Sequence, residues 1–179
     1  MKKKIIAFIA AFAVLASLFA GCGNASDGML IGKWAYIHEP ETTILAIKSN
    51  GTAFYKEKKY DCLVSDGFIV LNDGTESFKL RYFENDNGFD LYEQSTYIRT
   101  SEGDGIVGTW ECNNETFEFT EDGTFQEDGI FPGHYVVSED GSTVKLAYND
   151  PIEDTILYVA INGNEMFVEY PWPMVPATK

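Results

Sequence analysis

Leu30-Ile31-Gly32-Lys33-Trp34 and Ile106-Val107-Gly108-Thr109-Trp110 follow one pattern: two aliphatic residues, a glycine, a polar residue and a tryptophan. Side chains alternate between the two faces of a β-strand, so the glycine and the tryptophan of each copy share one face. Tryptophan brings about 150–250 Å² of surface to a core, and a glycine beside it lets the indole or a crossing strand approach closely. Two copies in one chain predict an internal repeat, with each copy opening one unit.

Turn signals divide the chain after the first copy into short segments. Asn-Gly and Asp-Gly pairs provide the positive φ angles of tight hairpins, and they recur at residues 50–51, 66–67, 73–74, 87–88, 122–123, 128–129, 140–141 and 162–163. No apolar stripe with a period of 3.6 residues extends over three turns, so no helix is expected there. The sequence predicts an all-β fold in which neighbouring strands form an antiparallel meander.

The segments between the turns alternate apolar and polar residues, as in strands with one wet face. The apolar members are expected to fill the interiors, because a unit of about 70 residues buries too little surface to spare its aromatic side chains. They are Phe78, Leu80, Tyr82, Phe117, Phe119, Leu146 and Tyr148. Two continuous apolar runs, at 68–71 and 156–161, are expected to be strands covered on both faces. The predicted organisation is repeat one at 29–100, a linker at 101–105, repeat two at 106–172 and a tail at 173–179.

The N-terminus has the order of a signal peptide at residues 1–21. Three lysines, Lys2 to Lys4, precede an uncharged apolar stretch that ends in small residues before Cys22. The stretch Leu18-Phe19-Ala20-Gly21-Cys22 resembles the lipobox of bacterial lipoproteins, although Phe19 stands where that family usually has leucine. The resemblance implies a diacylglycerol thioether on Cys22, a tether at 22–28 and a location on the extracytoplasmic face of the cell membrane. An ordinary secretory peptide with a chance cysteine is the alternative.

The Gly-x-Trp openings and the meander resemble the lipocalin-like (calycin) barrels, especially those of small bacterial lipoproteins. The resemblance rests on Gly32, Trp34, Gly108 and Trp110, and it implies two tandem small antiparallel barrels in which each tryptophan closes one end. A calycin barrel that carries a ligand needs about twice this repeat length. We therefore expect side chains to fill the interiors.

Charge excludes one class of partner. After cleavage at Cys22 the chain has 10 Lys and Arg against 28 Asp and Glu, a formal charge of −18. No basic groove for nucleic acid is compatible with that balance. Lys56-Glu57-Lys58-Lys59 is a basic island, which is interpreted either as an exposed hairpin or as a contact for lipid headgroups.

No constellation for catalysis, metal or cofactor is apparent. His38 and His134 have no ligand spacing around them and are expected at the surface. Carboxylates are too numerous for an acid–base pair to be chosen. Cys62 and Cys112 form either a disulfide, which the extracytoplasmic location permits, or two free thiols in strands. The segment 170–176 holds three prolines and is not expected to extend a sheet far.

These observations predict a non-catalytic lipoprotein that acts as a binding or interaction module. Its expected partners are the membrane, through the lipid on Cys22, and an unknown protein or small molecule. One alternative is a carrier of a small apolar ligand in a calycin-type cavity, and another is an inhibitor of a secreted enzyme.

Overall fold

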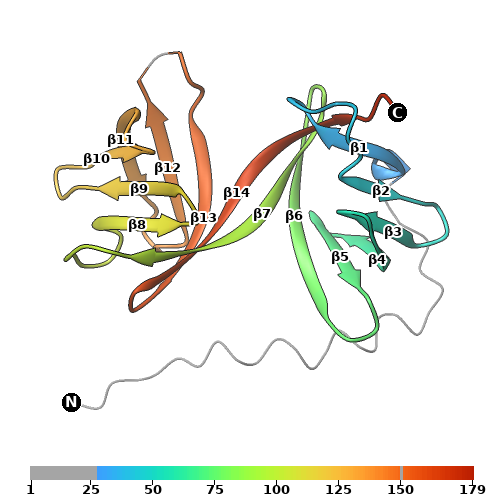
Figure 1. Cartoon of the computed structure of the whole chain (residues 1–179), viewed down its shortest axis with the longest axis horizontal. Coiled ribbons are helices and arrows are strands. Elements are labelled where there is room, and N and C mark those ends of the chain that lie inside the picture. Colours follow the sequence, from blue (N-terminus) through green and yellow to red (C-terminus); the bar gives the residue numbers. More distant parts are fainter. Residues whose placement is uncertain (1–27, 150) are drawn as a thin grey trace. The chain divides into compact units, whose positions relative to one another are not determined.

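The computed structural model describes residues 28–149 and 151–179, and this part of the chain is all-β (Figure 1). Within the described residues, a 3-10 turn, η2 (Gly28–Leu30), precedes the strands. The expected signal peptide at 1–21, Cys22 and the tether up to residue 27 lie outside the described residues. No helix in the described part is long and apolar enough to cross a membrane.

The described residues form one antiparallel sheet of fourteen strands. Seven come from repeat one: β1 (Gly32–Tyr36), β2 (Leu45–Ile47), β3 (Thr52–Tyr55), β4 (Lys58–Ser65), β5 (Phe68–Asn72), β6 (Ser77–Asn85) and β7 (Gly88–Arg99). Seven come from repeat two: β8 (Gly108–Cys112), β9 (Glu115–Phe119), β10 (Thr124–Glu127), β11 (Phe131–Val137), β12 (Thr143–Tyr148), β13 (Thr155–Asn162) and β14 (Glu165–Pro176). Each repeat begins with a five-residue tryptophan strand and ends with a twelve-residue strand.

Consecutive strands pair with one another, as a meander requires, and the strand order closes because β1 pairs with both β2 and β14. A further pairing joins β7 to β14. The first strand of each repeat is therefore paired with the last strand of the other repeat. Trp34 in β1 lies opposite Pro176 in β14, and Trp110 in β8 lies opposite Arg99 in β7.

Two compact units divide the described chain. Unit 1 holds residues 28–89 together with Met174–Lys179, and unit 2 holds Asp90–Pro173. The division falls inside β7 and β14, whereas the sequence pointed to a joint at 101–105 and a tail from 173. The expectation that 170–176 would extend little strand is wrong. β14 continues to Pro176 because Met174 and Val175, between the prolines, lie in register with Tyr36 and Ala35.

The hairpin between β4 and β5 confirms the turn chemistry expected at residues 66–67. Asp66 and Gly67 have φ angles of 51° and 77°, and Ser65 and Phe68 on either side are paired. Positive φ at both central residues belongs to a tight two-residue hairpin, whose twist matches that of the strands. The register of β4 and β5 is therefore set locally.

Most of the expected interior side chains are buried. Leu80, Tyr82, Phe117, Phe119, Leu146 and Tyr148 are buried as predicted, and Phe78 is half-buried against Tyr55 and Tyr60. The run at 68–71 is covered on both faces, because Ile69, Val70 and Leu71 are all buried. The same expectation for 156–161 is wrong. Leu157 and Val159 point inward from β13, while Ile156, Ala160 and Ile161 are exposed, so this strand has a wet face despite its apolar sequence.

Candidate functional site

The two tryptophans are equivalent anchors. The indole Nε1 of Trp34 donates to the carbonyl oxygen of Leu30 at 2.9 Å, and that of Trp110 donates to Ile106 at 2.7 Å, in each case four residues earlier. Both rings are buried. A buried indole N–H needs such a partner, and the shared geometry supports the repeat inferred from the two sequence copies.

Arg99 packs on the tryptophan of unit 2. Its guanidinium carbon lies 4.2 Å from the centre of the Trp110 ring, and the same group donates to the carbonyl oxygens of Gly105, at 2.6 Å, and Val107. A guanidinium over an indole is attracted by the ring quadrupole. Arg99 thus ties the 101–107 segment to the buried ring. Trp34 instead meets Phe89 edge to face at 4.9 Å in unit 1.

A cluster of tyrosines and glutamates occupies the part of unit 2 where the β8–β9 and β10–β11 hairpins turn. In β9, Phe117 and Phe119 point inward, so Glu115 lies on the same face. In β10, Phe125 points inward, which places Glu127 on its face. We call Tyr97, Glu115, Glu127, Tyr148 and Tyr170 the tyrosine–glutamate cluster.

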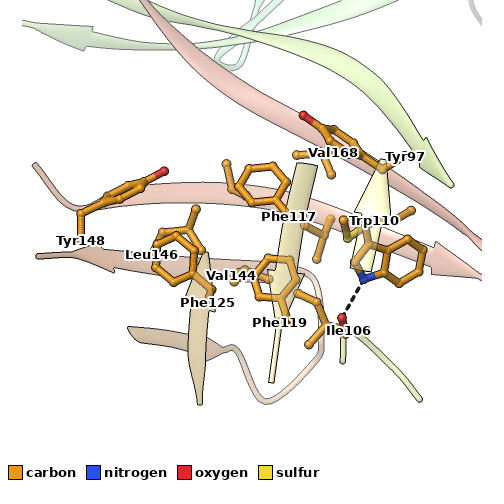
Figure 2. Close-up of a cluster of buried hydrophobic side chains, with 13 residues drawn as sticks. Tyr97, Ile106, Trp110, Phe117, Phe119, Phe125, Val144, Leu146, Tyr148 and Val168 are labelled. Carbon is orange, nitrogen blue, oxygen red and sulfur yellow. Dashed lines mark hydrogen bonds between the residues drawn. The ribbon is translucent and has the colours of Figure 1, made fainter. Parts of the chain in front are cut away.

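Hydrogen bonds join its members. The hydroxyl of Tyr97 donates to Glu115 Oε2 at 3.0 Å, and that of Tyr148 donates to Glu127 Oε2. Tyr148 is also hydrogen bonded to Tyr170. Tyr97 and Tyr148 belong to the buried core of unit 2, and Figure 2 shows their hydroxyl oxygens on the side of that core away from the Trp110–Ile106 hydrogen bond. Tyr97 and Tyr148 are buried, Glu127 and Tyr170 are half-buried and Glu115 is exposed, so the cluster extends from the core to solvent.

Burial has the largest effect on the pKa values of Glu127 and of the three tyrosines. It raises the pKa of the Glu127 carboxyl, and the charges of Asp128 and Glu115 raise it further, while the hydrogen bond from Tyr148 acts in the opposite direction. Burial also raises the pKa of Tyr97, Tyr148 and Tyr170, so their hydroxyls remain protonated donors. The cluster offers carboxylate acceptors beside aromatic rings, an arrangement that suits a cationic group.

Glu115 and Glu127 are not among the residues that the sequence pattern marks as candidates. The signal was present in the alternation, since each glutamate continues an inward-facing phenylalanine series, Glu115-x-Phe117-x-Phe119 and Phe125-x-Glu127. A carboxylate in a core-facing register breaks the local rule, and such breaks are expected at functional or strained positions. The abundance of carboxylates in the chain concealed this difference.

Cys62 and Cys112 are both free thiols. Cys62 is buried in unit 1, where desolvation raises its pKa to about 11. Cys112 is half-buried and packs against the core of unit 2. The structure thus presents the free-thiol alternative, and burial makes Cys62 a poor nucleophile because the thiolate is the reactive form.

The other candidate residues lie at the surface. His38 is exposed and stacks on Tyr36, with ring centres 5.5 Å apart. His134 is exposed on the outer side of unit 2, in a shallow hollow of about 320 Å³ that Glu118 and Gln126 also line. Lys58 of the basic island forms an ion pair with Asp73 at 2.5 Å. Within 28–149 and 151–179, no three His, Cys, Asp or Glu side chains are grouped to hold a metal ion.

The two units differ sharply in charge. The described residues of unit 1 include eight Lys and Arg and nine Asp and Glu, a formal charge of −1. Unit 2 includes two Lys and Arg and eighteen Asp and Glu, a formal charge of −16. Nearly all of the negative charge therefore belongs to the unit that carries the tyrosine–glutamate cluster.

Comparison of the chain with protein-family models, curated proteins and solved structures finds no match.

Proposed function

We propose that this chain is a lipid-anchored, extracytoplasmic binding module without catalytic activity, and that unit 2 recognises its partner. The main support for this proposal is the filled interior of unit 2. Thirteen buried side chains, six of them aromatic, pack there against one another. Because its own side chains occupy the interior, recognition falls to the surface.

We further propose that the fold is a pair of lipocalin-like barrels. The pairing of β7 with β14 divides the closed strand order into two rings, one of β1–β7 with β14 and one of β7–β14. Each ring has eight strands, a number whose interior is just wide enough for side chains or one small ligand. The Gly-x-Trp strands and the equivalent indole hydrogen bonds support this assignment.

Membrane attachment rests on the sequence around Cys22. Expression of the full chain in bacteria, followed by membrane fractionation and mass spectrometry, tests it. We expect the mature N-terminus at Cys22 with added acyl mass, and we expect Cys22→Ser to leave the chain unprocessed or released. An unmodified Cys22 in the mature protein would remove the anchor from the proposal.

The filled interior separates a surface-binding module from a carrier. Titration with a fatty acid and with an apolar fluorescent dye should give no saturable binding at micromolar concentrations, because a carrier needs a cavity of about 300 Å³ or more. Leu146→Ala, which opens space inside unit 2, provides a positive control for dye entry. Stoichiometric binding by the unaltered chain would favour the carrier instead.

A further inference from the structure

Unit 2 exposes apolar side chains beside the tyrosine–glutamate cluster. Ile130 is 68% exposed and Phe131 is 38% exposed at the turn between β10 and β11, and Ile152 is 39% exposed between β12 and β13. We call these three residues the apolar tip. Exposed apolar groups that lie together mark interaction sites more often than single ones do.

Backbone contacts place Ile130 and Phe131 next to the cluster. The Ile130 amide donates to the carbonyl oxygen of Glu127 at 3.1 Å, and Phe131 is the cross-strand partner of Glu127. Gly133 and Tyr135 point inward from β11, so Phe131 shares the inner face with Glu127. Ile152 belongs to the connection between β12 and β13, and at the start of that connection the Asn149 amide donates to the carbonyl oxygen of Pro132 at 3.0 Å.

Charge determines what can cover this tip. Glu115 follows the β8–β9 turn, and Glu127 and Asp128 lie at the β10–β11 turn. Glu153 is next to Ile152 in the sequence. The two cations of unit 2 are both engaged, Arg99 with Trp110 and backbone carbonyls, and Lys145 with Asp154 at 2.6 Å. An anionic membrane or an acidic protein would be repelled by unit 2, whereas a cationic surface would be attracted and steered toward it.

We propose that the apolar tip of unit 2 docks a segment of a partner protein in which lysine or arginine residues alternate with aliphatic or aromatic ones. The partner's apolar side chains cover Ile130, Phe131 and Ile152, and its cations meet the carboxylates of Glu115 and Glu127. Tyrosine rings beside those carboxylates add a favourable face for an ammonium or guanidinium group. This inference rests on the proposed binding function and names the class of its partner.

The test uses the full mature chain in nanodiscs of zwitterionic lipid, titrated with a short peptide of alternating lysine and leucine. A glutamate–leucine peptide and a lysine–serine peptide are the matched probes, and empty nanodiscs provide the lipid background. We expect saturable binding of the lysine–leucine peptide alone, weakened by added salt because exposed charges are screened. NMR shift changes should concentrate at the β10–β11 turn and around Ile152.

Two sets of variants locate the site. Ile130→Ser with Phe131→Ser should weaken binding about tenfold or more, as expected for apolar anchors, and Glu115→Gln should weaken it and reduce the salt dependence. Ile37→Ser is the matched control, because Ile37 is 51% exposed but belongs to unit 1. It should leave the affinity unchanged.

The proposal is overturned if the glutamate–leucine peptide binds equally well, if the tip variants bind normally, or if Ile37→Ser has the same effect. It is also overturned if vesicles of anionic lipid, without peptide, shift the same tip resonances. Circular dichroism of each variant checks that it is folded. The titration is repeated with the Cys22→Ser chain in solution, without nanodiscs, where no acyl group is needed. A failure of lipidation at Cys22 and a failure of this docking site are therefore seen separately.

Discussion

Glu127 is the residue at which sequence pattern and environment disagree most clearly. Its side chain lies on the inward-facing side of β10, where the carboxylate accepts a hydrogen bond from the buried Tyr148. A core built for stability alone would place an apolar side chain there. We interpret the retained carboxylate as part of a recognition surface, for which the chain tolerates a cost in folding.

We expect Glu127→Gln to stabilise the folded chain near neutral pH. Burial raises the pKa of Glu127 above its unfolded value, so the folded chain binds more protons than the unfolded chain between the two values. The stability of the wild type therefore falls as pH rises through that window. Below a pH of about 4 the carboxyl is protonated in both states, and the advantage of the variant should disappear. Urea unfolding at both pH values measures the difference.

Glu118→Gln is the control for this prediction. Glu118 is also a glutamate of unit 2 but is exposed on the outer face of β9, so its substitution should change the unfolding free energy little at either pH. A Glu127→Gln variant that is less stable than wild type at neutral pH would show that the Tyr148 hydrogen bond outweighs the burial of the charge.

Replacement of Trp110 by Ala should cost about 3–5 kcal/mol of stability, because a fully buried aromatic side chain is lost and a cavity remains. Arg99 would also lose the ring beneath it. Trp172→Ala, at a half-buried position of the same unit, should cost less. Thermal unfolding of the two variants provides the comparison, and equal losses would contradict the anchoring role of Trp110.

At the scale of the elements, the ends of β7 and β14 complete the edges of the tryptophan strands. Met174, Val175 and Pro176 pair with β1, and the following segment continues the contact, since the Ala177 amide donates to Lys33 and the Thr178 amide to Pro40, each at 2.9 Å. Met174 is fully buried. Unit 1 therefore depends on residues that lie last in the chain.

Removal of residues 174–179 should destabilise unit 1 more than unit 2. Without its partner, β1 would present unpaired backbone groups at an edge, and the cover that Met174 provides would be lost. Hydrogen exchange should show faster exchange of the β1 and β2 amides, while the β9 to β12 amides remain protected. A chain that ends at Thr100 lacks the same cover and should fold poorly, and retention of full β1 protection in either truncation would contradict this dependence.

At the scale of the whole molecule, charge separates the two units. Self-repulsion among like charges destabilises a compact state, and unit 2 carries a formal charge of −16 against −1 for the described part of unit 1. The unit that begins after the proposed tether is thus nearly neutral, while the acidic unit is the one suited to a cationic partner.

Added salt should therefore protect unit 2 preferentially. Screening shortens the range of repulsion between exposed carboxylates to about 8 Å at physiological ionic strength. Amide exchange measured in low and in moderate salt should slow in the strands of unit 2 and change little in those of unit 1. Equal slowing in both units would indicate a general salt effect rather than relief of repulsion.

The all-β class, the two tryptophan anchors, the Asp66-Gly67 hairpin turn and most of the interior could be predicted from the residues alone. These features depend on residues close in sequence: Asp66-Gly67 selects a turn, and the alternation in 115–119 separates the faces of one strand. The lipid site at Cys22 is likewise a prediction from a local pattern, and it lies outside the described residues.

Long-range packing, by contrast, sets which strands close the sheet, which apolar strand keeps a wet face and which glutamates meet tyrosines. The pairing of β1 with β14 joins the first and the last strand of the described sequence, and no local pattern encodes it. The exposure of one face of β13 depends on whether another element covers that face. The contact of Glu127 with Tyr148 depends on the register of two separate hairpins. Such properties arise from long-range packing, which propensity and alternation do not specify.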